Sequence, residues 1–339
     1  MFSLALRSFC LVTPIFFSIS ACGEKTTDSA STDTIDTGST DTTDTTDTTD
    51  TIDTSDTTDT TDTTDTTDTT TLTFNTLRST GTHSYTTDTG TVSVNNCNSG
   101  MPYTQYTPNN VSNPQQVVLS HGFARSSANM IGWAEHWASW GFEVYVVDLC
   151  HLSFLDSNHI QNGHDLVTFT TSLNISTPIY VGHSAGGLAS ILAATENTST
   201  RAVIGLDATD NSDPFGNGGG DGLQNAYKVQ VPTLGLVGEP SNCNSNNNGI
   251  DMLQTIPTHH VFRVQDADHC DFETPTDGLC TGFCTYSGSI SKDDIHNNIT
   301  VLSTAGLLWL SGNNTDADTF WIGAEKDALL ASGMLEEIE

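Results

Sequence analysis

The chain has 339 residues and a formal charge of −32, from 9 basic and 41 acidic residues. Positions 24–72 contain 13 Asp residues and Glu24, but only one basic residue, Lys25. Residues 73–339 contain the other 27 acidic residues and 7 basic residues. This acidic balance argues against a nucleic-acid partner, because phosphate binding needs clusters of Lys and Arg. No apolar run of about 20 residues follows the N-terminus, so a polytopic membrane protein is not expected either.

The first 21 residues have the pattern of an export signal. Arg7 is followed by a short apolar stretch over 9–19 and by the small residues Ser20 and Ala21. The string ISACG at 19–23 resembles the lipobox of bacterial lipoproteins, in which the cysteine becomes lipidated and begins the mature chain. The resemblance predicts lipidation at Cys22 and attachment to a bacterial membrane, at the outer membrane or the cell surface. An ordinary secretory signal is the alternative.

Residues 22–72 are expected to be the lipidated cysteine and a disordered linker. From position 32 to 71 the chain repeats Thr-Thr-Asp with no apolar periodicity. Such a segment cannot bury enough surface to offset its conformational entropy, and its like charges repel one another. A calcium-binding repeat is the alternative, although the glycines and the fixed spacing of known Ca²⁺ loops are absent.

Beyond the linker, strand and helix patterns alternate, which predicts an α/β fold with a mostly parallel sheet and helices on both faces. An antiparallel hairpin is expected to open the domain, with strands at 82–85 and 90–94. The domain is assigned to 73–312, and 313–339 is set apart as a tail of unknown role. The remaining predicted strands are 116–120, 142–149, 178–181, 202–206, 233–237 and 260–264, and the predicted helices are 127–140, 159–173, one after 184, and 295–310.

The sequence GHSAG at 182–186 fits the motif G-x-S-x-G between a predicted strand and a predicted helix. In that context the glycines allow a tight turn that exposes the serine hydroxyl, so Ser184 is the predicted nucleophile. The backbone N–H groups of Ala185 and Phe123 are the predicted oxyanion-hole donors, the second from the loop SHGF at 120–123. His121 is expected to orient that loop, and His183 to pack beneath the nucleophile.

The base and the acid are sought after later strands, in the chain order Ser, acid, His. His269 follows the predicted strand 260–264 by a short loop and is the predicted base. Asp207, at the end of the strand 202–206, is the first choice for the acid. Asp210 is the second choice and Glu239 the third.

These segments together resemble the α/β-hydrolase superfamily, and within it chlorophyllase-like and cutinase-type polyester-hydrolase-like serine esterases. The resemblance covers about 115–311 and includes YVGHSAGG, GLDATD and DADHCDFE. It implies a Ser-His-Asp triad with the acid at Asp207. In the polyester hydrolases the catalytic acid lies at a position that corresponds to Ser241 in this chain. Because serine is not an acid, that position does not carry over.

Cysteine usage agrees with export. Besides Cys10 and Cys22 there are six cysteines, for which three disulfides are expected but 15 pairings are possible. A zinc site is the alternative, because two of the six lie close together in sequence. The six are Cys97, Cys150, Cys243, Cys270, Cys280 and Cys284.

The leading hypothesis is a membrane-tethered serine esterase that acts on a small-molecule or polymeric ester through an acyl-enzyme. It needs no metal or organic cofactor. An amidase or peptidase with the same triad is one alternative, and a non-catalytic surface-binding module on a hydrolase scaffold is another. Trp133, Trp137 and Trp140 have helical spacing, which is typical of core packing but would also suit an aromatic wall beside the cleft.

Overall fold

The computed structural model of the chain describes residues 72–153, 156–211, 219–284 and 286–339. The predicted signal, the predicted lipidation site Cys22 and the Thr/Asp segment up to residue 71 lie outside the described residues. The described residues belong to one compact unit.

Within the described ranges, nine strands form one sheet in the order β1-β2-β4-β3-β7-β8-β9-β10-β11. All neighbours from β4 to β10 are parallel, and the pairs at the two edges are antiparallel. The strands are β1 Tyr85–Val92, β2 Met101–Pro108, β3 Gln116–Ser120, β4 Glu143–Val147, β7 Ile179–His183, β8 Ala202–Leu206, β9 Thr233–Val237, β10 His259–Val264 and β11 Leu335–Ile338, while β5 Leu152–Ser153 and β6 Asp156–Ser157 make a separate small hairpin.

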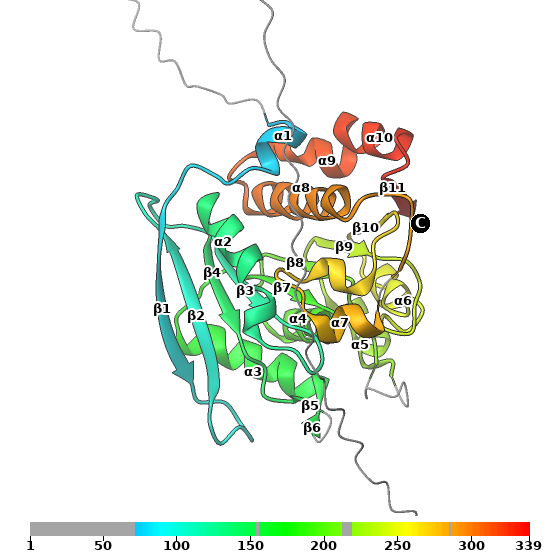
Figure 1. Ribbon diagram of the computed structural model, residues 1–339. Coiled ribbons are helices and arrows are strands. Elements are labelled where there is room, and N and C mark those ends of the chain that lie inside the picture. The colour runs from blue at the N-terminus through cyan, green and yellow to red at the C-terminus, as the bar shows by residue number, and fades with distance from the viewer. Residues whose placement is uncertain (1–71, 154–155, 212–218, 285) are drawn as a thin grey trace, which may run out of the picture. The chain divides into compact units, whose positions relative to one another are not determined.

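Helices cover both faces of this sheet (Figure 1). The predicted helices are found close to their expected bounds, and the one after residue 184 starts directly at Ala185. The α-helices are α1 Phe74–Leu77, α2 Ile131–Ser139, α3 His159–Ser172, α4 Ala185–Glu196, α5 Asp221–Asn225, α6 Gly249–Gln254, α7 Gly278–Phe283, α8 Lys292–Ser311, α9 Thr319–Ile322 and α10 Ala324–Ala331.

The sheet separates two apolar cores. In β3, Val117 and Leu119 point into the core under α2 and α8, whereas Val118 points into the core under α3 and α4. The central strands are therefore buried on both faces, which explains why they are continuous apolar runs rather than alternating patterns. Trp133 and Trp137 are buried in the first core, so the helical spacing of these two residues reflects packing rather than a cleft wall.

The opening hairpin is antiparallel as predicted, but its strands lie elsewhere. The first strand is β1 at 85–92, and its partner is β2 at 101–108, a segment for which no strand was predicted. Pro102 and Pro108 weaken the strand pattern of that segment. They are tolerated because both lie at the ends of β2, where few ladder hydrogen bonds are needed.

The segment 313–339, which the sequence analysis set apart as a tail of unknown role, packs against the rest of the domain. Phe320 and Trp321 of α9 are buried in the core beneath α8, and Trp321 donates a hydrogen bond from Nε1 to the Leu302 carbonyl. Farther along, β11 pairs with β10 and closes that edge of the sheet. Residues 313–339 thus belong to the same folded unit as the rest of the domain.

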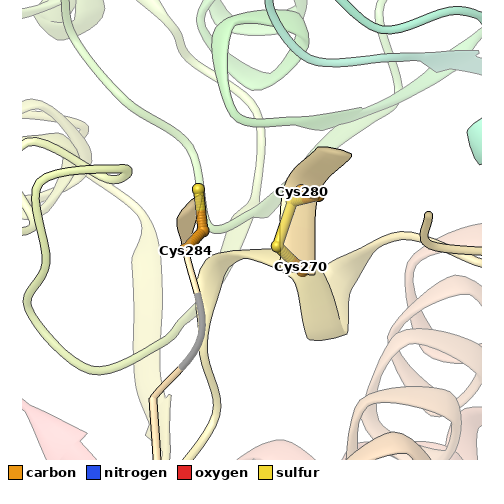
Figure 2. A group of neighbouring side chains, drawn as sticks. All are labelled: Cys270, Cys280 and Cys284. Carbon is orange, nitrogen blue, oxygen red and sulfur yellow. A yellow bond between two sulfur atoms is a disulfide. The ribbon is translucent and has the colours of Figure 1, made fainter. Parts of the chain in front are cut away.

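All six cysteines of the domain form disulfides. Cys97–Cys150 joins the β1–β2 loop to the segment after β4. The other two, Cys243–Cys284 and Cys270–Cys280, converge on α7. Figure 2 shows Cys284 beside the Cys270–Cys280 pair. The sulfur atoms of these three residues lie within 4.8 Å of one another, but their disulfides leave no free thiolate for the zinc site that the sequence left open.

Candidate active site

Ser184 occupies a sharp turn between β7 and α4, with backbone angles φ 55° and ψ −124°. A Cβ atom on Gly182 would lie 2.2 Å from the Gly186 carbonyl oxygen, and one on Gly186 would lie 2.4 Å from the His121 carbonyl oxygen. Both motif glycines are therefore required by close backbone approach. The turn is anchored by a hydrogen bond from the Ser184 N–H to the Leu206 carbonyl, 3.0 Å long, at the end of β8.

His269 lies between the predicted nucleophile and the predicted acid. Its Nδ1 is 2.6 Å from Asp207 Oδ2, and its Nε2 is 2.9 Å from Ser184 Oγ. Because an ionised carboxylate only accepts hydrogen bonds, Nδ1 carries the proton and Nε2 accepts from the serine hydroxyl. Ser184 is 6% exposed, His269 7% and Asp207 1%, so the three groups interact largely out of water.

These three residues come from neighbouring parts of one sheet edge. Ser184 follows β7, Asp207 follows β8, and His269 follows β10 by a short loop. Since these strands are parallel, their carboxyl ends lie at the same edge, where sites form in α/β proteins. The structure brings together the three residues that the sequence selected.

The two other candidate acids have different partners. The Asp210 carboxylate accepts hydrogen bonds of 2.8 Å from the N–H groups of Gly222 and Leu223, at the start of α5. Glu239 Oε1 accepts from the Asp266 N–H. Within the described ranges, neither carboxylate is hydrogen-bonded to His269, whereas Asp207 is, so the geometry separates the three acids that the sequence left open.

Asp207 is held by groups that no sequence motif identifies. The Gly238 N–H donates to Asp207 Oδ1 at 3.0 Å, and Asn244 Nδ2 lies 3.2 Å from Oδ2. Asn244 is fully buried and also donates to the Glu239 carbonyl. It lies in the Asn-rich segment 241–249, where composition does not distinguish it from its exposed neighbours.

A second buried group lies beneath His269. His183 is within hydrogen-bond distance of the His269 carbonyl through Nε2, at 3.0 Å, and the two rings are 4.5 Å apart between centroids. Burial lowers the pKa of His183 well below its usual value, so this imidazole is neutral and donates through Nε2. His183 therefore packs under the site, as predicted, and fixes the backbone of the residue that would move the proton.

A buried ion pair lies next to His183. Glu273 is 3.7 Å from His183 Nδ1 and forms a two-pronged salt bridge with Arg125, at 2.6 and 2.7 Å. Burial raises the pKa of Glu273, while the Arg125 guanidinium opposes that shift. The pair ties the loop after β3 to the segment that carries His269. Glu273 ends the segment DADHCDFE and Arg125 follows the loop 120–123, but sequence reasoning gave neither residue a role.

The predicted oxyanion donors lie in the correct region. Phe123 and Ala185 both line the cavity that contains Ser184. The Ala185 N–H is the first of α4, where an amide has no partner within its own helix. His121 is buried, accepts from the Leu149 N–H through Nε2 and contacts the Gly122 carbonyl through Nδ1. It thus orients the loop, as predicted.

The site opens into a cavity of about 1150 Å³. On one side lies the segment 241–249, with Asn242 and Asn246. On another lies α7, with Leu279 and Phe283. The cavity is larger than most small-molecule sites, which span about 300–1,000 Å³.

Among the described residues, no helix combines the length and the apolar character needed to cross a membrane. No known protein-family model matches the chain, and no curated protein sequence matches it either. Functional assignment therefore depends on the geometry of the site.

Proposed function

We propose that the chain is a serine hydrolase of the α/β-hydrolase superfamily that cleaves carboxylic esters through an acyl-enzyme. The observation that carries this proposal is the unbroken hydrogen-bonded series from Ser184 through His269 to Asp207. The mostly parallel sheet, with the serine at the turn after β7, supports the superfamily.

The geometry is suited to a stepwise acyl transfer. Ser184 Oγ attacks the ester carbonyl carbon while its proton passes to Nε2 of His269. The charge of Asp207 stabilises the imidazolium, and the N–H groups of Phe123 and Ala185 bind the oxyanion. His269 then returns the proton to the departing alcohol, and a water molecule, activated by the same imidazole, releases the acid and restores Ser184.

The decisive experiment is Ser184→Ala, assayed with p-nitrophenyl butanoate and its anilide counterpart. In comparable enzymes, loss of the nucleophile costs about 10⁴–10⁶ in kcat. Ser190→Ala is the matched control, because Ser190 is buried in the same helix α4 and its hydroxyl has no hydrogen-bond partner in the described part of the chain. Equal activity of Ser184→Ala and Ser190→Ala would refute the proposal. Faster anilide than ester turnover would favour an amidase.

Export and anchoring are part of the same proposal. Three disulfides in the domain favour an oxidising compartment, and the lipobox-like string favours lipidation at Cys22. The expected result is that Cys22→Ser releases the protein from the membrane fraction. Retention of the variant in that fraction would contradict the lipid anchor.

A further inference from the structure

One wall of the cavity presents polar side chains that the fold does not use. Asn242 and Asn246 are exposed and line the cavity. Across the described ranges, neither side chain makes a hydrogen bond. Asp251 lines the same wall and is also exposed. Amide groups can both donate and accept hydrogen bonds, so this wall suits a ligand that does the same.

The segment that carries these amides, 241–249, is rigid. Buried Asn244 accepts from the Ser241 N–H at 2.8 Å, and the Asn246 N–H donates to the Ser241 carbonyl at 2.7 Å. Cys243 is fixed to Cys284 by a disulfide. These contacts fix the backbone at Asn242 and Asn246, which lowers the entropy cost of presenting their side chains to a ligand.

The backbone of this segment is also strained. Ser245, Asn246 and Asn247 have consecutive positive φ values of 53°, 56° and 61°. Left-handed conformations cost non-glycine residues free energy, and such costs concentrate at binding and catalytic sites. Asn246, in the middle of this turn, lines the cavity.

The adjoining wall is apolar. Phe283 is 82% exposed and Leu279 56%, both on α7 and both lining the cavity. The Sγ of Cys243 lies 3.7 Å from the Phe283 carbonyl oxygen, which places the amide wall next to the apolar one. A ligand that fills both must have an apolar part and a polar part that donates and accepts hydrogen bonds.

The charge of the domain further limits the chemistry of the ligand's polar part. Residues 73–339 carry 27 acidic against 7 basic residues, and Arg125, the cation that lines the cavity, is paired with Glu273 and Asp277. A carboxylated or phosphorylated ligand would be repelled by this field. The polar part is therefore not an anion.

We propose, on the basis of the serine esterase assigned above, that the preferred substrate is an ester of a neutral sugar with an apolar acyl group. Asn242 and Asn246 bind the sugar hydroxyls, and α7 with Phe283 contacts the apolar group. A sugar ring also holds its hydroxyls in fixed relative positions, which a short open-chain polyol does not. The cavity volume of about 1150 Å³ accommodates such a two-part ligand.

The test compares two butanoates of equal ring size, methyl 6-O-butanoyl-glucopyranoside and cyclohexylmethyl butanoate. The expected result is a higher kcat/KM for the sugar ester. The double variant Asn242→Ala/Asn246→Ala is expected to lower the ratio of the two kcat/KM values about tenfold, since each lost hydrogen bond costs about a factor of three. Asn313→Ala is the control, because Asn313 is exposed and lies outside the cavity lining.

Two outcomes would overturn the inference while leaving the esterase intact. One is equal kcat/KM for the two esters together with an unchanged ratio in the double variant. The other is turnover of glycerol monobutanoate as efficient as that of the sugar ester, which would show recognition of any polyol. Loss of activity on both butanoates in Ser184→Ala separates these outcomes from failure of the esterase proposal itself.

Discussion

Replacing Asp207 by Asn tests the link between geometry and chemistry most directly. The carboxylate lies 2.6 Å from His269 Nδ1, and its charge would stabilise the imidazolium formed during attack. At an effective dielectric constant of about 20, unit charges separated by about 2.6–4 Å interact by about 4–6 kcal/mol. Since about 1.36 kcal/mol corresponds to a factor of ten in rate, kcat is expected to fall by about 10³–10⁴.

The assay is the steady-state hydrolysis of p-nitrophenyl butanoate, with circular dichroism to confirm folding. Asp210→Asn is the matched control, because Asp210 follows the same strand, is equally buried, and binds backbone N–H groups rather than His269. Its kcat is expected to stay within a factor of about three of wild type, which is less than one hydrogen bond to a charged group is worth. Asp207→Asn with kcat within tenfold of wild type would refute the role assigned to this acid.

Three further changes are expected to alter stability. Trp321→Ala should lower the free energy of unfolding in urea by about 3–5 kcal/mol, because Trp321 is fully buried; a loss below 1 kcal/mol would contradict its packing. Cys97→Ser/Cys150→Ser should cost about 4 kcal/mol by the loop-entropy relation for a separation of 53, and an unchanged denaturation midpoint would argue against this bridge. Burial lowers the pKa of His136 to about 4, below its unfolded value of about 6.5. The unfolded state therefore binds the proton more readily, and between pH 7 and pH 5 the wild type should lose about 1–2 kcal/mol more than His136→Gln; equal losses would contradict this.

Periodicity predicted the central sheet well because its strands are buried on both faces. The strands 202–206 and 233–237 match β8 and β9 at both ends, since each is a closed apolar run between turn residues. The segment 101–108 was missed, because its strand character comes from pairing with both β1 and β4. Such pairing is a tertiary property that local pattern does not encode.

The candidate site likewise contains some residues that the sequence identified and others that it did not. Ser184 has a motif, and His269 and Asp207 have diagnostic positions after strands, so sequence reasoning located all three. Asn244 has neither, and Glu273, although it ends the segment DADHCDFE, was given no role. Their roles arise from burial against Asp207 and His183, and they are visible only when distant segments are folded together. Disulfide pairing was undecidable for the same reason.

The proposed triad and the wall of the cavity beside it are supported in different ways. Ser184 and Asp207 are locked to one another through the ladder of adjacent strands, by the bond from the Ser184 N–H to the Leu206 carbonyl. By contrast, the short helix α7, which lines the cavity, is held by two disulfides, Cys243–Cys284 and Cys270–Cys280. Residues of α7 could therefore be exchanged to change which substrates the cavity binds. The alignment of Ser184, His269 and Asp207 would be retained, because it depends on the strands of the sheet.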